Sequence, residues 1–154
     1  MINKLKELYK ECFNDSKSYM DFFFKEKYSK SNTPYIMKNN LIISMLFIVP
    51  KKIFLRNITL ICPYIVGACT RKEYRNTGLI TSLFYNCFHL LYKREITTIA
   101  LYPLNHNFYR KYGFVTLNRM TKRKINYKID NNLKLINENN LTELRKYCLR
   151  LRKK

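Results

Sequence analysis

The segment from Ala68 to Leu83 constrains the fold of this chain more than any other, because it combines a strand end, a polar turn and a helix start. Upstream, the short apolar runs 59–62 and 65–69 contain β-branched residues, which predicts a buried strand interrupted at Pro63. Downstream, apolar residues recur at helical spacing. They are Leu79, Leu83, Phe84, Cys87, Phe88, Leu90 and Leu91. The segment therefore predicts a strand, a turn and a helix in direct succession.

The turn itself, residues 75–78, has the properties of an anion site. Gly78 lacks the Cβ that would keep a phosphate away from the backbone. The first N–H groups of a helix have no internal partner and lie at the positive end of its dipole, so they can hold a pyrophosphate. Arg75 adds a charged donor. Many surface turns have the same Arg-x-x-Gly pattern without binding an anion, so spacing alone leaves both interpretations open.

This turn resembles the acetyl-coenzyme A loop of the GNAT N-acetyltransferases, whose pattern is Gln/Arg-x-x-Gly-x-Gly/Ala. Arg75 and Gly78 match that pattern, the flanking residues 73–74 also match, and Ile80 replaces the small last residue. The departure at Ile80 is similar to the branch that contains the enhanced-intracellular-survival acetyltransferase. Residues 8–50 also resemble the amino-terminal part of the clostridial-type acetyltransferases.

A second motif, at residues 108–114, is similar to the Tyr-x-x-x-Gly-Phe signature of the same family. Together the two motifs imply an α/β (α+β) chain with the GNAT acyl-CoA N-acyltransferase fold. Its central sheet would be mixed and mostly antiparallel, with helices on its flanks. The resemblance places the N-acetyltransferase domain at residues 1–130, and we expect a basic C-terminal helix at 131–154 packed on the same domain.

The resemblance also implies a reaction, the transfer of an acetyl group from acetyl-CoA directly to a primary amine of a small molecule or peptide. In the family, backbone groups at the positions of Ala68, Cys69 and Thr70 pair with the pantetheine arm, and Tyr109 lies where a tyrosine protonates the leaving sulfur. Arg75 would bind phosphate through its charge. The pyrophosphate would be held by Asn76, Thr77, Gly78, Leu79, Ile80 and Thr81.

Several of these residues have a second interpretation. Tyr109 is one of 13 tyrosines and can be structural. Cys69 can be a nucleophile, but an apolar strand without a nearby histidine favours a packed thiol. His106 can act as the base, because an unperturbed histidine titrates near pH ~6.5, or it can be an exposed loop residue. Glu73 is more typical of a surface carboxylate, so the general base stays unassigned.

The remaining elements follow from periodicity and turn residues. Residues 5–12 predict an amphipathic helix, and Asp15 or Ser16 can cap a second helix that carries the aromatic run 22–24. An Asn-rich turn joins two strands within 34–49. Gly113 ends a short helix that contains Phe108 and Tyr109. Further strands are predicted at 53–60, 96–101, 114–116 and 124–129.

The charge is unusual, because 30 Lys+Arg against 10 Asp+Glu give a net charge of +20. Such a field attracts nucleic acid, anionic membranes or the phosphates of coenzyme A. Lys, Asn and Ile are abundant throughout, which also fits a base-composition bias of the source genome. Two alternatives to the enzyme therefore stay open: a basic nucleic-acid-binding module, and a truncated relative that binds coenzyme A without turnover. The charge favours a neutral or anionic small-molecule amine as acceptor, and a homodimer stays open.

The five cysteines form no Cys-x-x-Cys pair, which indicates packed thiols in a reducing compartment. With only two histidines, we expect no metal cluster. No apolar run approaches the ~20 residues that span a bilayer, so we expect no membrane association. Together with the two motifs, these features predict a cytoplasmic enzyme.

Overall fold

The structure is a computed structural model that describes residues 1–55 and 57–117, and Met1–Val115 form one compact unit. The predicted strand at 124–129, the helix at 131–154 and the domain boundary at 130 lie outside the described residues. The helices and strands are α1 (Ile2–Cys12), α2 (Lys17–Glu26), η1 (Lys30–Asn32), β1 (Tyr35–Lys38), β2 (Leu41–Val49), β3 (Lys52–Leu55), β4 (Ile58–Ile61), β5 (Tyr64–Thr70), η2 (Lys72–Tyr74), α3 (Leu79–Tyr92), β6 (Ala100–Leu101) and α4 (His106–Arg110).

The central sheet has the order β1-β2-β5-β6. β1 pairs with β2 and β2 pairs with β5 in antiparallel fashion, whereas β5 and β6 are parallel. Asn39 and Asn40 both have positive φ angles, 47° and 62°, as the tight turn between two twisted antiparallel strands requires. The predicted mixed, mostly antiparallel sheet and its first hairpin are confirmed.

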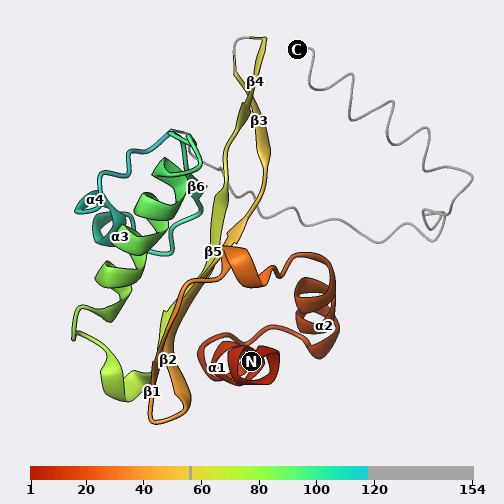
Figure 1. Ribbon diagram of the computed structural model, residues 1–154, viewed down its shortest axis with the longest axis vertical. Coiled ribbons are helices and arrows are strands. Elements are labelled where there is room, and N and C mark those ends of the chain that lie inside the picture. Colours follow the sequence, from red (N-terminus) through yellow and green to blue (C-terminus); the bar gives the residue numbers. More distant parts are fainter. Residues whose placement is uncertain (56, 118–154) are drawn as a thin grey trace, which may run out of the picture. The chain divides into compact units, whose positions relative to one another are not determined.

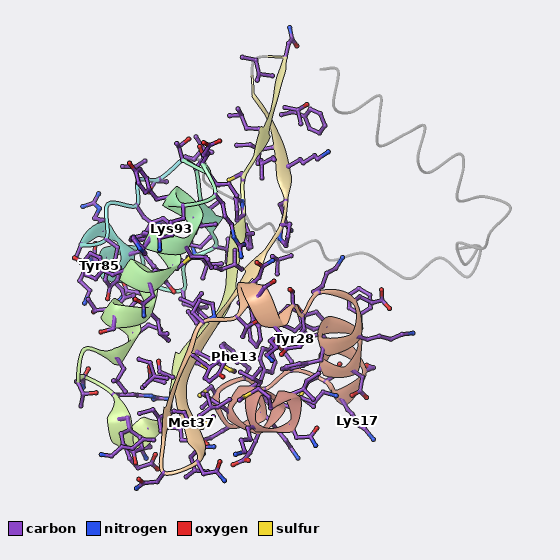
Figure 2. The ribbon with its side chains drawn as sticks, viewed as in Figure 1. Phe13, Lys17, Tyr28, Met37, Tyr85 and Lys93 are labelled. Carbon is purple, nitrogen blue, oxygen red and sulfur yellow. The ribbon has the colours of Figure 1, made fainter. Side chains whose placement is uncertain are left out.

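Helices cover both faces of this sheet (Figure 1): α1 and α2 lie on one face, α3 and α4 on the other. The side chains of β2 alternate between the two layers. Met45 and Phe47 join the core cluster of α1 and α2, whereas Leu46 and Ile48 join that of α3. Because both faces of β2 are buried, the strand is apolar at every position except Ser44. In Figure 2, Phe13 and Tyr28 lie on the α1–α2 side, and Tyr85 and Lys93 extend from α3.

Two polar anchors position α1 and α2. Ser16 caps α2, because its Oγ accepts a hydrogen bond from the Tyr19 N–H at 3.2 Å. Arg71, at the end of β5, donates through Nε to the Ile42 carbonyl at 3.0 Å and through Nη2 to Glu7 at 2.9 Å, and Nη1 pairs with Glu11. Since Glu7 and Glu11 both belong to α1, this one guanidinium joins the helix to two strands.

The strand predicted at 53–60 is wrong, because this region is a hairpin of two strands, β3 and β4. Asn57 adopts a φ of 66° in the turn between them. The Cys62 N–H donates to the Lys51 carbonyl at 2.8 Å, so the hairpin extends the β2–β5 pair past the two prolines. Figure 1 shows it projecting beyond the helices. The prediction that 59–62 are all buried is also wrong, since Ile61 is exposed and only Cys62 is buried.

Two other predicted strands differ from the structure. The run 96–101 contributes only Ala100 and Leu101 to the sheet, and Glu95 before it adopts a φ of 57°. The run 114–116 forms no strand. A segment with high β-propensity becomes a strand only where it can hydrogen-bond to a neighbouring strand. Within the described residues only β6 pairs with that side of β5, and it does so at two positions.

Candidate active site

A β-bulge in β5 shapes the centre of the sheet. Met45 lies opposite Cys69, and Phe47 lies opposite Val66. Two residues of β5, Gly67 and Ala68, therefore lie opposite the single residue of β2 between Met45 and Phe47. Gly67 has a φ of +60°, and a Cβ there would lie 2.9 Å from Cδ2 of Phe47. The bulge therefore requires glycine.

The sheet opens on the far side of this bulge. β6 pairs with β5 only at Tyr64 and Ile65, which precede the bulge, and the described residues provide no further strand on that side. The Arg71 N–H donates to Ile43 at 2.9 Å, and backbone groups alternate direction along an antiparallel strand. Thr70 and Ala68 therefore direct their backbone groups away from β2. Consistent with this, the Thr70 carbonyl accepts a hydrogen bond from Arg75 Nε at 3.2 Å.

The turn after β5 leads directly into α3. Asn76 has a φ of 62°, and the Thr77 hydroxyl donates to the Tyr74 carbonyl at 2.6 Å. Gly78 is the N-cap residue of α3, with a φ of 82° and no side chain to cap the first N–H groups. A Cβ on Gly78 would meet nothing within 4 Å. The N-terminus of α3 therefore faces open space.

The free edge of β5 and the N-terminus of α3 border one cavity of about 650 Å³. Its lining residues are Cys12, Phe13, Ala68, Cys69, Thr70, Tyr74, Arg75, Asn76, Gly78, Leu79, Ile80, Thr81, Leu104, Phe108, Tyr109 and Lys111. Of the site residues predicted from the sequence, only Thr77 is not among them. Arg75 and Lys111 are the charged residues of the lining and both are cationic, so the cavity suits an anion.

Tyr109, on α4, also lines the cavity. Its ring packs edge-on against Phe84 of α3, with centroids 5.9 Å apart and an angle of 85° between the rings. Burial, and secondarily the neighbouring Tyr112, raise the pKa of the Tyr109 hydroxyl. The group therefore stays protonated at neutral pH and can donate a proton. His106 is exposed and, like Glu73, does not line the cavity.

Sequence reasoning did not identify Cys12 or Phe13 as site residues. Cys12 and Phe13, at the end of α1, line the cavity although they lie far from β5 in the sequence. The helical spacing of Cys12 predicted that one face of the helix is buried, but it did not show which element that face packs against. Leu104, Phe108 and Lys111 also line the cavity. The last two fall within the second motif, but their orientation depends on how α4 packs.

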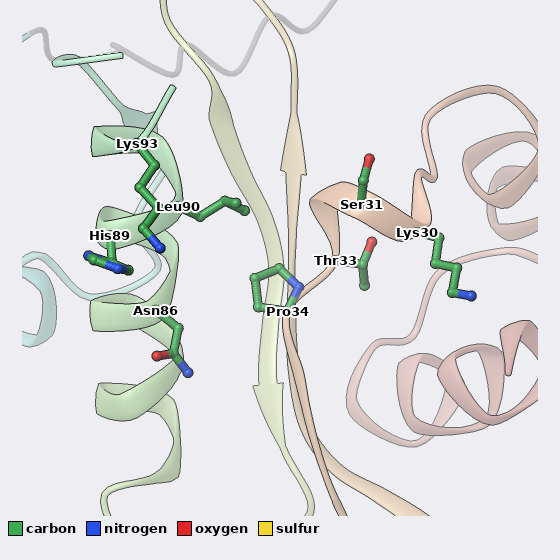
Figure 3. Close-up of a pocket in the computed structure, with 8 residues that line it drawn as sticks. All are labelled: Lys30, Ser31, Thr33, Pro34, Asn86, His89, Leu90 and Lys93. Atoms are coloured by element: carbon green, nitrogen blue, oxygen red, sulfur yellow. The ribbon is translucent and has the colours of Figure 1, made fainter. Parts of the chain in front are cut away.

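A second, smaller cavity of about 360 Å³ lies between η1 and α3 (Figure 3). Asn86, His89 and Lys93 line it from α3, and Thr33 and Pro34 lie opposite them. In Figure 3 the Lys30 side chain points away from α3. None of the predicted site residues lines this cavity.

The comparison with protein families identifies the fold. The family model of the acetyltransferase (GNAT) domain matches residues 1–117. The chain belongs to the GNAT acetyltransferase family. The α+β prediction is thereby confirmed, and the fold is the GNAT fold. No protein with a curated description matches the sequence.

Solved structures share this fold. A probable N-acyltransferase from Enterococcus faecalis has a TM-score of 0.63 and 18% identity, over 72% of this chain but only 29% of that one. A predicted acetyltransferase with acetyl-CoA from Clostridium acetobutylicum has a TM-score of 0.60 and 21% identity. The match covers 79% of this chain and 84% of that one. Glucosamine-6-phosphate N-acetyltransferase from Arabidopsis thaliana has a TM-score of 0.59 and 16% identity. The match covers 82% of this chain and 95% of that one. The GNAT chain thus spans less than a third of the Enterococcus protein.

The described part of the GNAT chain has neither a candidate membrane-spanning helix nor a candidate metal cluster. None of its helices combines the length and apolar character needed to cross a membrane. In the same residues, no group of three or more His, Cys, Asp or Glu side chains could hold a metal ion.

Proposed function

We propose that the GNAT chain binds acetyl-CoA in the 650 Å³ cavity and transfers the acetyl group directly to a primary amine. One observation carries the proposal: the edge of β5 that has no strand partner among the described residues and the uncapped N-terminus of α3 border the same cavity, which Arg75 and Lys111 also line. A strand edge can pair with the amides of a pantetheine arm, and a helix N-terminus can bind a pyrophosphate.

Different residues of the cavity wall are suited to different parts of the coenzyme. Backbone groups of Ala68 and Thr70 are suited to the pantetheine amides, because they point away from β2 and this edge of β5 has no strand partner among the described residues. The backbone groups of Cys69 face β2, so the structure does not favour the predicted contact at that residue. The backbone of 76–81 is suited to the pyrophosphate, with Arg75 beside it. The Thr77 hydroxyl is already donated to Tyr74, so Thr77 contributes through its N–H. Gly78 leaves the space that a phosphate needs. When bound, the coenzyme supplies an acetyl group activated as a thioester.

Tyr109 supports the chemistry of the transfer. Tyr109 lines the cavity and its raised pKa keeps the proton in place, so Oη can deliver a proton to a departing thiolate. An N–H on the free edge of β5 can donate to the oxygen that becomes negative during the transfer. Both groups are held by packed secondary structure, which keeps them oriented before the substrates bind.

The charge of the cavity wall indicates which kind of amine can be the acceptor. Arg75, Lys111 and the net charge of +20 repel a polycationic amine, so a neutral or anionic amine is favoured. The general base is not assigned, and exposed His106 remains a prediction for it. Placement in the clostridial-type or enhanced-intracellular-survival branch rests on Ile80 and residues 8–50, and it too stays a prediction, as does the cytoplasmic location.

Calorimetric titration with acetyl-CoA tests the proposal, using Gly78→Glu and a matched control, Gly113→Glu. Both glycines have positive φ, 82° and 85°, and both would place a Cβ in open space, but only Gly78 lines the cavity. We expect micromolar binding by the parent and by Gly113→Glu, and loss of binding in Gly78→Glu. Equal binding by all three would contradict the site, and no binding by the parent would contradict the function.

A further inference from the structure

Two cysteine thiols meet in the wall of the large cavity. Cys12 is the last residue of α1 and Cys69 lies near the end of β5, and both line the cavity. Cys12 packs against the core cluster that contains Cys69, and each thiol shifts the ionisation of the other. Cys12 Sγ also lies 3.8 Å from the Thr70 carbonyl oxygen. Two residues that are 57 positions apart are thus side by side.

The two thiols differ in ionisation. The Cys69 side chain, with a smaller contribution from Arg75, lowers the pKa of Cys12 to about 7, whereas burial and the Glu11 carboxylate oppose the shift. The Cys12 side chain, together with burial, raises the pKa of Cys69. The pair therefore loses its first proton around pH 7, from Cys12, and Cys69 keeps its own proton.

Accessibility separates this pair from the other described cysteines. Cys12 is partly exposed, whereas Cys62 and Cys87 are buried. Burial raises the pKa of both buried thiols, that of Cys87 to about 12, and neither lines the cavity. Thiolate character and access together decide which cysteine reacts.

We propose that Cys12 and Cys69 form a reactive dithiol, in which Cys12 attacks a small-molecule disulfide in the cavity and Cys69 resolves the product to a Cys12–Cys69 disulfide. This is a covalent modification site within the wall of the catalytic cavity. It depends on the two thiols and on access to the cavity, not on the acetyl transfer.

The reaction has two balanced steps. First, the Cys12 thiolate forms a bond to one sulfur of the small disulfide, its S–S bond breaks, and one small thiolate leaves and takes up a proton from solvent. Next, Cys69 loses its proton and attacks the Cys12 sulfur, and the second small thiolate leaves with that proton. The dithiol loses two electrons and the small disulfide gains them.

Treatment with oxidised glutathione tests this in the full chain that carries Cys148→Ser, so that the fifth thiol does not interfere. Mass spectrometry should find the loss of two hydrogens and a cross-linked peptide pair that contains Cys12 and Cys69. Cys69→Ala should instead trap one glutathione on Cys12. Cys12→Ala should form neither the internal disulfide nor the mixed disulfide. A mixed disulfide that persists in the parent, or equal reaction of Cys12→Ala, would overturn the proposal.

Alkylation with iodoacetamide supplies an independent measurement. The rate at Cys12 should rise with pH around a midpoint near 7, and in Cys69→Ala that midpoint should move up towards the ~8.5 of a free cysteine. An unchanged midpoint would refute the effect of Cys69 on the ionisation of Cys12. Added acetyl-CoA should protect Cys12. Without protection, the proposed coenzyme site fails while the dithiol stands, so the two proposals are tested separately.

Discussion

Gly67 of β5 lies directly against the ring of Phe47 on the neighbouring strand. A Cβ added to Gly67 would approach Cδ2 of Phe47 to 2.9 Å and Cε2 of Tyr9 to 3.3 Å. Phe47 cannot withdraw, because the rings of Tyr9, Phe23, Phe24 and Tyr28 surround it. The bulge that opens the sheet is therefore held in place by the aromatic core beneath it.

Gly67→Ala should destabilise the protein. Positive φ costs about 1 kcal/mol for a residue with a Cβ, and overpacking of the core costs about 1–3 kcal/mol more. Gly113→Ala, which also has positive φ but enters open space, should lose only the first amount. Urea unfolding measures both, and equal losses would show that Phe47 yields to the added methyl group.

Arg71→Met should loosen α1 from the sheet. The guanidinium is well covered and joins Glu7, Glu11 and the Ile42 carbonyl, so its loss should cost about 1–3 kcal/mol in the free energy of unfolding. Lys25→Met is the control, because the Lys25–Glu26 pair is exposed and should contribute less than about 0.5 kcal/mol. If urea unfolding gave the same small loss for both variants, Arg71 would be only a surface residue.

Tyr109→Phe should lower kcat by about a hundredfold or more, while acetyl-CoA affinity changes little. The ring and its packing against Phe84 remain, and only the proton donor is lost. Tyr85→Phe, at an exposed position on α3, should leave kcat unchanged. Because the pKa of Tyr109 lies above its ordinary value of 10.0, any decline in activity that begins below that pH must come from another group. Unchanged turnover in Tyr109→Phe would remove it from the mechanism.

Alkaline stability should depend on Tyr9. Its hydroxyl donates to Asp15 at 2.6 Å, and burial and this hydrogen bond raise its pKa well above the ordinary 10.0. Above that pH the unfolded chain releases a proton that the folded chain keeps, so stability falls as pH rises. Tyr9→Phe should show a smaller fall than the parent in urea unfolding measured from neutral to alkaline pH. Parallel declines would mean that Tyr9 titrates alike in both states.

Much of the site could be predicted because its signals are local. The helix 79–92 follows from apolar spacing, and the conformation at Gly78 follows from the needs of a tight turn. Residues 68–81 are also nearly contiguous, so one strand, one turn and one helix bring them together. For these residues, order in the sequence is close to order in space.

The rest depends on pairing that no local pattern encodes. The two runs around Asn57 read as one strand, since a lone asparagine is a weak turn signal next to so many β-formers. Phe114 and Val115 have the composition of a strand but no strand partner in the described part of the chain. Cys12 joined the site only through the packing of α1 on β5, and its spacing showed a helix face without showing a neighbour.

The open edge of β5 has a consequence for how such a site changes over generations. Main-chain N–H and C=O groups are the same for every amino acid but proline, so substitutions along this strand leave its recognition groups in place. What must be inherited is the bulge at Gly67, together with the two-residue pairing that keeps β6 short. Drift can therefore erase most of the sequence while the backbone shape persists, as between this chain and the three structures that share 16–21% identity with it.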